Sequence, residues 1–173
     1  MSHLRSLRDL FVHELQDLHS AESQLLKALP KMERAASDPD LKKAFSNHLG
    51  ETRAQLERLD RCFASLAAAP GSHTCEAMKG LIKEGEEIIG AEADPIVRDA
   101  ALISAAQRVE HYEIAGYGSA KAYADILDFD DLESLLDQTL SEESKADKKL
   151  TKIAMGGLLS KGLNQEAMAP HRS

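Results

Sequence analysis

The stretch VRDAALISAAQRVEHYEIAGYGSAKAYA, residues 97–124, decides the fold class of this chain. Apolar residues recur through it at three- and four-residue steps, with Ile103 and Val109 in its middle, which is the period of one buried helical face. Just before it stands Pro95, a residue favoured in the first turn of a helix. The sequence therefore predicts a long helix over residues 94–127.

The same helical period recurs on both sides of that stretch. In the first predicted helix, residues 2–36, Pro30 should bend or break the helix, because proline has no amide hydrogen and its ring crowds the preceding turn. A shorter pattern, interrupted by three glycines, marks a crossover segment in the middle of the chain. The expected helices cover residues 2–36, 40–68, 77–90 and 131–154, with turns at residues 37–40 and 128–131.

Length and composition favour one all-α domain. At 173 residues the chain has the size of a single domain. The absence of Trp, the aromatic content of 4% and the small number of prolines argue against a β-sandwich or barrel. Two helical hairpins joined by a long crossover are the arrangement of ferritin-like four-helix bundles. We expect such a bundle over residues 1–155, with a short extra helix in the crossover, and a loosely ordered tail over residues 156–173.

Charge and hydropathy limit the partners and the location. The net charge of −8 disfavours nucleic acids and anionic membranes, since no basic surface exists to neutralise phosphates. No apolar run is long enough for a signal peptide or a membrane span, so the expected location is the cytoplasm. Cys62 and Cys75 are too few for a disulfide framework, which agrees with a reducing compartment.

Several charged residues fall where the helical period requires apolar ones. Each of the four long predicted helices carries at least one such acid. Carboxylates that converge in a low-dielectric core are costly unless they are neutralised, and two divalent cations would neutralise them. Oxygen-rich ligands with one imidazole suit iron or manganese, whereas structural zinc takes more sulfur or histidine. The candidate metal ligands are Glu22, His48, Glu51, Glu110, Glu113, Glu143 and Asp147.

The spacing of these residues departs from the usual motif of such sites. The chain contains no Glu-x-x-His, the common ligand pair of dinuclear carboxylate bundles. It has the reverse order in His48-x-x-Glu51, and it has Glu110-x-x-Glu113, and steps of three residues still place both side chains on one helical face. Two alternatives stay open. In the first alternative, the acids are surface groups on helices whose buried face is displaced by one position. In the second, His48 is a residue at the edge of the core that bonds Glu51 and no metal ion.

Five segments carry a resemblance that covers nearly the whole chain up to about residue 154. They are AESQLLKALPKMERA, HLGETRAQLERLD, CEAMKGLIKE, VRDAALISAAQRVEHYEIAGYGSAKAYA and TLSEESKADKKLTKIA, and they are similar to the YciE/YciF family of small bacterial ferritin-like proteins. The resemblance implies a ferritin-like bundle, a homodimer and a link to bacterial stress responses. It also implies a metal site at Glu22, Glu51, Glu110, Glu113, Glu143 and Asp147, with His48 and Asp17 as further candidates.

Three functions are compatible with these observations. The favoured one is a di-iron protein with ferroxidase- or peroxidase-like chemistry on dioxygen or peroxide, in which Tyr112 and Tyr117 could hydrogen-bond the ligating carboxylates. The alternative is a non-enzymatic stress protein whose metal ions only stabilise the bundle. Iron storage in a hollow cage is the weakest of the three, because no feature of the sequence points to cage-forming interfaces.

Overall fold

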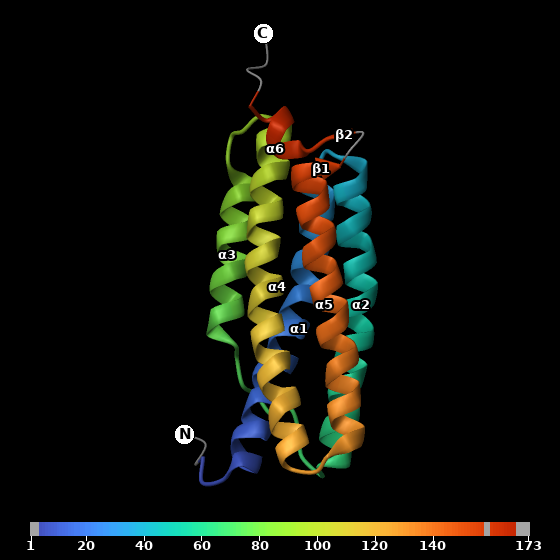
Figure 1. The fold of residues 1–173 in the computed structure, drawn as a ribbon. Coiled ribbons are helices and arrows are strands. Elements are labelled where there is room, and N and C mark those ends of the chain that lie inside the picture. Colours follow the sequence, from blue (N-terminus) through green and yellow to red (C-terminus); the bar gives the residue numbers. More distant parts are fainter. Residues whose placement is uncertain (1–3, 158–159, 169–173) are drawn as a thin grey trace.

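The computed structural model describes residues 4–157 and 160–168. Four long helices lie side by side along the molecule, and a shorter helix in the crossover packs against two of them (Figure 1). The expected all-α, ferritin-like four-helix bundle with a long crossover and a short extra helix is confirmed. The helices of the bundle are α1 (Leu7–Ala35), α2 (Pro39–Ser65), α4 (Pro95–Ile126) and α5 (Asp130–Met155), and the crossover helix is α3 (Glu76–Gly90).

Local hydrogen bonds set the start of α1 and the end of α2 a few residues inside the predicted limits. The predicted start at Ser2 lies outside the described residues, and α1 begins after Ser6, whose hydroxyl accepts the Asp9 amide hydrogen as an N-cap. Ala67 has a φ of 50° and ends α2, because the amide of the following Ala68 bonds back to the carbonyl of Phe63. The prediction that this helix extends to residue 68 is therefore wrong by one turn.

Pro30 lies inside α1 without breaking it. The helix continues to Ala35, so the predicted break does not occur, and the predicted bend stays a prediction. A proline removes one backbone hydrogen bond, but Leu29 and Met32 on either side of it are buried in the core. Their burial offsets the cost of the lost bond and keeps the last turns helical.

The apolar core consists of two separate clusters of buried side chains. The Leu25 cluster includes Leu25, Phe45, Leu102, Ile103 and Leu150. The Phe11 cluster includes Phe11, Leu15, Leu59, Tyr117 and Leu136. Each of the four long helices carries one or more buried polar residues near the border of these two clusters, so a polar layer crosses the middle of the bundle.

One buried acid outside that layer has a purely structural set of partners. Asp99, which the sequence analysis did not single out, is completely buried on α4. It accepts the Ser37 amide hydrogen at 2.8 Å, the Ser37 hydroxyl hydrogen at 2.6 Å and the Asp38 amide hydrogen at 2.7 Å. Asp99 therefore fixes the turn between α1 and α2 to the start of α4.

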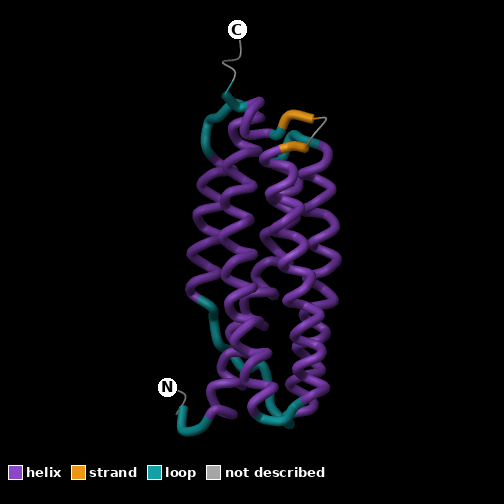
Figure 2. Tube along the Cα trace, viewed as in Figure 1, coloured by secondary structure: helices purple, strands orange, loops and turns teal. Residues whose placement is uncertain are grey.

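The segment that follows α5 is partly folded, although its weak pattern predicts a loose tail. It forms β1 (Gly156–Gly157), β2 (Ser160–Lys161) and the short helix α6 (Leu163–Glu166), which lie at the C-terminal end of the bundle (Figure 2). Burial of Leu163 in the Leu25 cluster holds α6 in place. Residues 158, 159 and 169–173 lie outside the described residues, and the division at residue 155 stays a prediction. Among the described residues, no helix is both long and apolar enough to cross a bilayer.

Candidate metal centre

The polar layer brings five of the predicted ligands together from all four long helices. We call them the acid cluster, and each of them is at most 5% exposed. The alternative in which these acids lie on the surface is wrong, because their side chains are buried inside the bundle. The acid cluster consists of Glu22 on α1, His48 on α2, Glu110 and Glu113 on α4, and Glu143 on α5.

Four members of the acid cluster are close enough to share one ion. His48, Glu110, Glu113 and Glu143 each offer one donor atom, and these atoms lie within 4.8 Å of one another. The Nε2 atom of His48 is 3.4 Å from an oxygen of Glu110 and 3.7 Å from an oxygen of Glu143. Carboxylate oxygens and an imidazole nitrogen gathered in this way form a ready set of ligands for a divalent cation.

Glu22 faces the same space from α1 and is held by a tyrosine. The Tyr117 hydroxyl donates a hydrogen bond of 2.5 Å to one oxygen of Glu22. Burial raises the pKa of Glu22 well above its usual range, and the negative charge of Glu143 raises it further. The expectation that a tyrosine bonds one of these acids is thus met at Tyr117.

The acid cluster leaves an unusual number of buried polar atoms without partners. Most native buried polar atoms are hydrogen-bonded, so each exception needs an explanation. Among the described residues, the following atoms of the cluster have no hydrogen-bond partner: Glu22 Oε2, His48 Nε2, Glu110 Oε2, both side-chain oxygens of Glu113, and Glu143 Oε2. Asp99 shows that this chain can satisfy a buried carboxylate completely where the role is structural.

The electrostatics of the cluster disfavour the ionised forms of Glu110 and Glu113, as of Glu22, in the absence of a cation. Burial raises the pKa of Glu110 well above its usual range, and the charge of Glu143 adds to that rise. Burial likewise raises the pKa of Glu113, followed by the charges of Glu22 and Glu143. A bound cation would remove this repulsion and favour the ionised forms.

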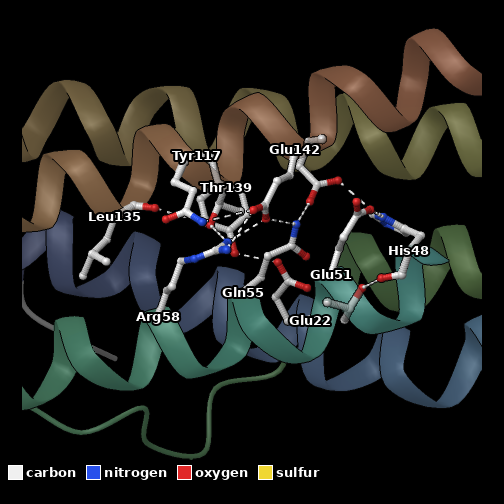
Figure 3. Close-up of polar contacts among 12 residues, drawn as sticks. Glu22, His48, Glu51, Gln55, Arg58, Tyr117, Leu135, Thr139 and Glu142 are labelled. Carbon is white, nitrogen blue, oxygen red and sulfur yellow. Dashed lines mark hydrogen bonds and ion pairs between the residues drawn. The ribbon is translucent and has the colours of Figure 1, made fainter.

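His48 presents its two ring nitrogens to two different surroundings (Figure 3). Nε2 faces the cluster, while Nδ1 lies 3.4 Å from an oxygen of Glu51. Burial alone would lower the pKa of His48, but the hydrogen bond with Glu51 and the negative charge of Glu143 raise it. Glu51 therefore orients the ring so that Nε2 is directed at the acids, as carboxylates behind metal-bound histidines do.

The end of the cluster away from His48 is closed by hydrogen-bond donors. Gln55 on α2 donates to Glu143 and, at 3.3 Å, to Glu142. Arg58 donates two hydrogen bonds of 2.6 and 2.8 Å to Glu142 and a third of 3.1 Å to Thr139 (Figure 3). The guanidinium of Arg58 thus neutralises Glu142, and its hydrogen bonds go to Glu142 and Thr139.

Two predicted ligands lie outside the acid cluster. The Glu51 side chain is 46% exposed and reaches only the outer nitrogen of His48. The Asp147 side chain is 21% exposed, accepts a hydrogen bond of 3.0 Å from Gln107, and lies 3.4 Å from a ring nitrogen of His111. The structure therefore places Glu51 on the outer side of the His48 ring and Asp147 at the edge of the acid cluster.

The remaining candidate, Asp17, belongs to a different set of contacts. It accepts a hydrogen bond from Tyr112 and lies 2.9 Å from a ring nitrogen of His73. The Cys75 sulfur is 3.0 Å from the Tyr112 hydroxyl oxygen. Tyr112 thus ties the crossover to α1 instead of bonding an acid of the cluster.

Sequence reasoning missed the roles of Gln55 and Arg58. Gln55 lies seven residues after His48 on α2, two helical turns along the same stripe, so its inward direction was available from the sequence. Its completely buried amide oxygen has no hydrogen-bond partner among the described residues. The contacts of Arg58 with Thr139 and Glu142 depend on how α2 packs against α5, which the periodicity does not specify.

The donor set fits oxygen-preferring metal ions. The four carboxylates of the acid cluster carry four negative charges when ionised, which equals the charge of two divalent cations. The set contains one imidazole and no thiolate, unlike the ligands of structural zinc sites. The orphaned oxygens of Glu113 and Glu143 are the atoms that such ions would satisfy.

Comparisons with known proteins agree with the fold. Residues 6–167 match the family described as "Domain of unknown function (DUF892)". The chain is 44% identical over 163 residues to Protein YciF of Escherichia coli strain K12, and the match covers 94% of this chain and 98% of YciF.

Solved structures give the same result. The crystal structure of the E. coli stress protein YciF superposes with a TM-score of 0.86 at 45% identity, over 88% of this chain and 96% of YciF. YcfI of Rhodopseudomonas palustris, whose description proposes a structural role, gives a TM-score of 0.84 at 45% identity, over 87% and 96% of the two chains. A protein of Xanthomonas campestris shares the fold alone, with a TM-score of 0.70 at 20% identity over 94% and 93%. As its sequence motifs predict, the chain belongs to the DUF892 family and is a YciF-like protein.

Proposed function

We propose that the acid cluster holds two divalent metal ions, iron or alternatively manganese, and that the protein uses them for oxidative chemistry on dioxygen or peroxide. The observation that supports this proposal is the set of buried carboxylate oxygens with no hydrogen-bond donor among the described residues. Burying such groups without compensation is costly, and the four charges of the acids equal those of two divalent ions.

The side chains around the cluster have separate tasks in this proposal. His48 offers the Nε2 lone pair, and Glu51 holds the ring in the orientation that this requires. Tyr117 fixes one oxygen of Glu22 and leaves the other free for an ion. The Leu25 and Phe11 clusters exclude water on both sides. When bound, iron or manganese would supply Lewis acidity and one-electron redox chemistry.

The alternative is a non-enzymatic, stress-associated protein whose metal ions only stabilise the bundle. The description of the R. palustris relative favours this alternative, because it proposes a structural role for a chain with 45% identity. The name of the E. coli relative, a stress protein, is compatible with both functions. Both also need the same acid cluster, so they differ in whether the bound ions react.

Anaerobic loading with ferrous iron tests the proposal. We expect the protein to take up two ions per chain, and subsequent dioxygen or peroxide to be consumed with the absorption of oxo-bridged ferric pairs. Glu113→Gln should abolish both, while Glu57→Gln, which removes an exposed acid from α2, should change neither. Uptake without oxidant consumption supports the structural alternative, and no uptake by folded protein contradicts both.

The assembly and the location of the protein are separate expectations. The resemblance implies a homodimer, and light scattering of the purified protein measures the mass in solution. A mass of twice 18.9 kDa would agree with a dimer, whereas a much larger mass would indicate a cage. The expected cytoplasmic location is tested by fractionating cells that produce the tagged protein.

A further inference from the structure

A cavity of about 100 Å³ lies beside the acid cluster, in the gap between α2 and α5. It is open to solvent on its outer side, and its inner wall includes two members of the cluster. The residues that line it include His48, Glu51, Glu110, Lys145, Ala146 and Lys149.

The burial of the acid cluster is uneven, and the difference follows this cavity. Glu22, Glu113 and Glu143 have no exposed surface. The exposed fractions of Glu110 and His48 are 3% and 5%, and both residues line the cavity. The cavity therefore joins the acids to solvent at the His48 end, while Gln55 and Arg58 close the opposite end with hydrogen bonds to α5.

We propose that metal ions reach the acid cluster through the cavity between α2 and α5, with Glu51 as the first ligand that they meet. This inference rests on the proposed metal-binding function. The exposed carboxylate of Glu51 stands on the solvent side of the His48 ring, and the Nε2 atom on the other side of the ring faces Glu110 and Glu143. Carboxylate, imidazole and inner carboxylates thus follow one another from solvent to site, so an incoming ion can exchange its water ligands in steps.

The residues at the solvent side of the cavity, which we call its mouth, set the rate at which metal ions enter. Lys145 and Lys149 lie one turn apart on α5 and bring two positive charges to the mouth. They repel cations, so the carboxylate of Glu51 is the local group that attracts an ion. Ala146 forms part of the wall, and its small side chain keeps the cavity open.

Uptake of Co²⁺ measured by stopped-flow absorbance tests the route, because ligand-field bands report binding without any turnover. Glu51→Gln should slow uptake by about tenfold or more, through the loss of an attractive charge at the mouth. Ala146→Leu adds three carbon atoms to the wall and should slow uptake to a similar extent without altering any charge. Lys149→Gln should accelerate uptake by several-fold. The control Glu57→Gln removes a charge from the exposed face of α2 and should load at the rate of the unmodified protein.

Equilibrium dialysis with Co²⁺ separates the route from the site. Ala146→Leu should bind the same number of ions per chain as the unmodified protein, because it touches no donor atom of the acid cluster. Slow uptake at full final stoichiometry supports the proposal. Full stoichiometry with unchanged rates in both Ala146→Leu and Glu51→Gln overturns it, while the metal centre stands. If the unmodified, folded protein binds no Co²⁺, the proposed function itself fails, and the route fails with it.

Discussion

Tyr117 donates its hydroxyl hydrogen to Glu22 across 2.5 Å, and neither residue has exposed surface. The bond links α4 to α1 at the boundary between the polar layer and the Phe11 cluster. It occupies one oxygen of Glu22, and the other oxygen has no hydrogen-bond partner among the described residues. Tyr117 therefore orients an acid of the cluster and also belongs to the apolar core.

Replacing Tyr117 by Phe should lower the free energy of unfolding of the metal-free protein by about 1–3 kcal/mol, because a buried carboxylate oxygen loses its only donor among the described residues. Urea denaturation followed by circular dichroism measures the change. Tyr123→Phe is the matched control, since Tyr123 is on the same helix and only partly buried. Equal stabilities of both variants would contradict the role given to the Tyr117 hydroxyl.

Glu113→Gln should raise the free energy of unfolding of the metal-free protein by about 1–4 kcal/mol. Burial raises the pKa of Glu113, so folding at neutral pH must either protonate this acid or bury its charge, and the neutral amide avoids that cost. The same variant should lose the increase in melting temperature that metal ions give to the unmodified protein. Differential scanning calorimetry with and without metal measures both effects. A large loss of stability in the metal-free state would show that Glu113 has a structural partner.

Asp99→Asn should have the opposite effect and lower the free energy of unfolding by about 2–4 kcal/mol. Asp99 is as buried as Glu113, but it accepts three hydrogen bonds from Ser37 and Asp38. An amide at this position has a single oxygen acceptor and no charge. The metal-dependent increase in melting temperature should remain, which separates this acid from those of the cluster.

Arg58→Met should destabilise the protein by about 1–3 kcal/mol, because Glu142 then keeps a largely buried charge without its counter-ion. The double variant with Glu142→Gln should recover much of that loss, since no unpaired charge remains. Lys121→Met is the control: its ion pairs with Glu133 and Asp137 are more exposed, so it should destabilise the protein less than Arg58→Met does. Chemical denaturation of the unmodified protein, Arg58→Met, Glu142→Gln and the double variant gives the coupling energy of Arg58 and Glu142. Costs that simply add in the double variant would count against their pairing.

Burial raises the pKa of the Cys62 thiol to about 11. At pH 8 the thiolate is therefore scarce, and the folded protein should react very slowly with a thiol reagent at this position. Below the ordinary thiol value near 9, Cys62 is protonated in both the folded and the unfolded chain, and the stability of the fold is fully retained. As pH rises from there through 11, the unfolded chain ionises at Cys62 before the folded protein does, so the free energy of unfolding decreases. Absorbance assays with Cys75→Ser measure the rate at Cys62, and fast reaction at pH 8 without denaturant would contradict the prediction.

The sequence predicts the bundle well, because helical periodicity depends on residues that are near one another in the chain. Glu22 lies between Leu18 and Leu25 on one stripe, so its inward direction follows from spacing alone. The helix ends are less predictable, since single capping contacts such as the Ser6 hydroxyl decide them.

The composition of the candidate site is predicted less well, for a geometric reason. Residues three apart on a helix differ in direction by about 60°, which is enough for His48 to face the core while Glu51 faces solvent. Asp99 was missed because its partner Ser37 is 62 residues earlier in the chain. Only the packing of α4 against the first hairpin brings these two residues together.

The separation of the core into the Leu25 and Phe11 clusters has a consequence for how the molecule holds together. Each half of the bundle has its own hydrophobic centre, and between them the four long helices pass through the polar layer, whose acids repel one another. Without a cation this layer is the least stable part of the bundle, and its amide hydrogens exchange with solvent faster than those of the two apolar halves. A cation bound there would connect the four helices through their carboxylates, so that the two halves unfold in one cooperative transition.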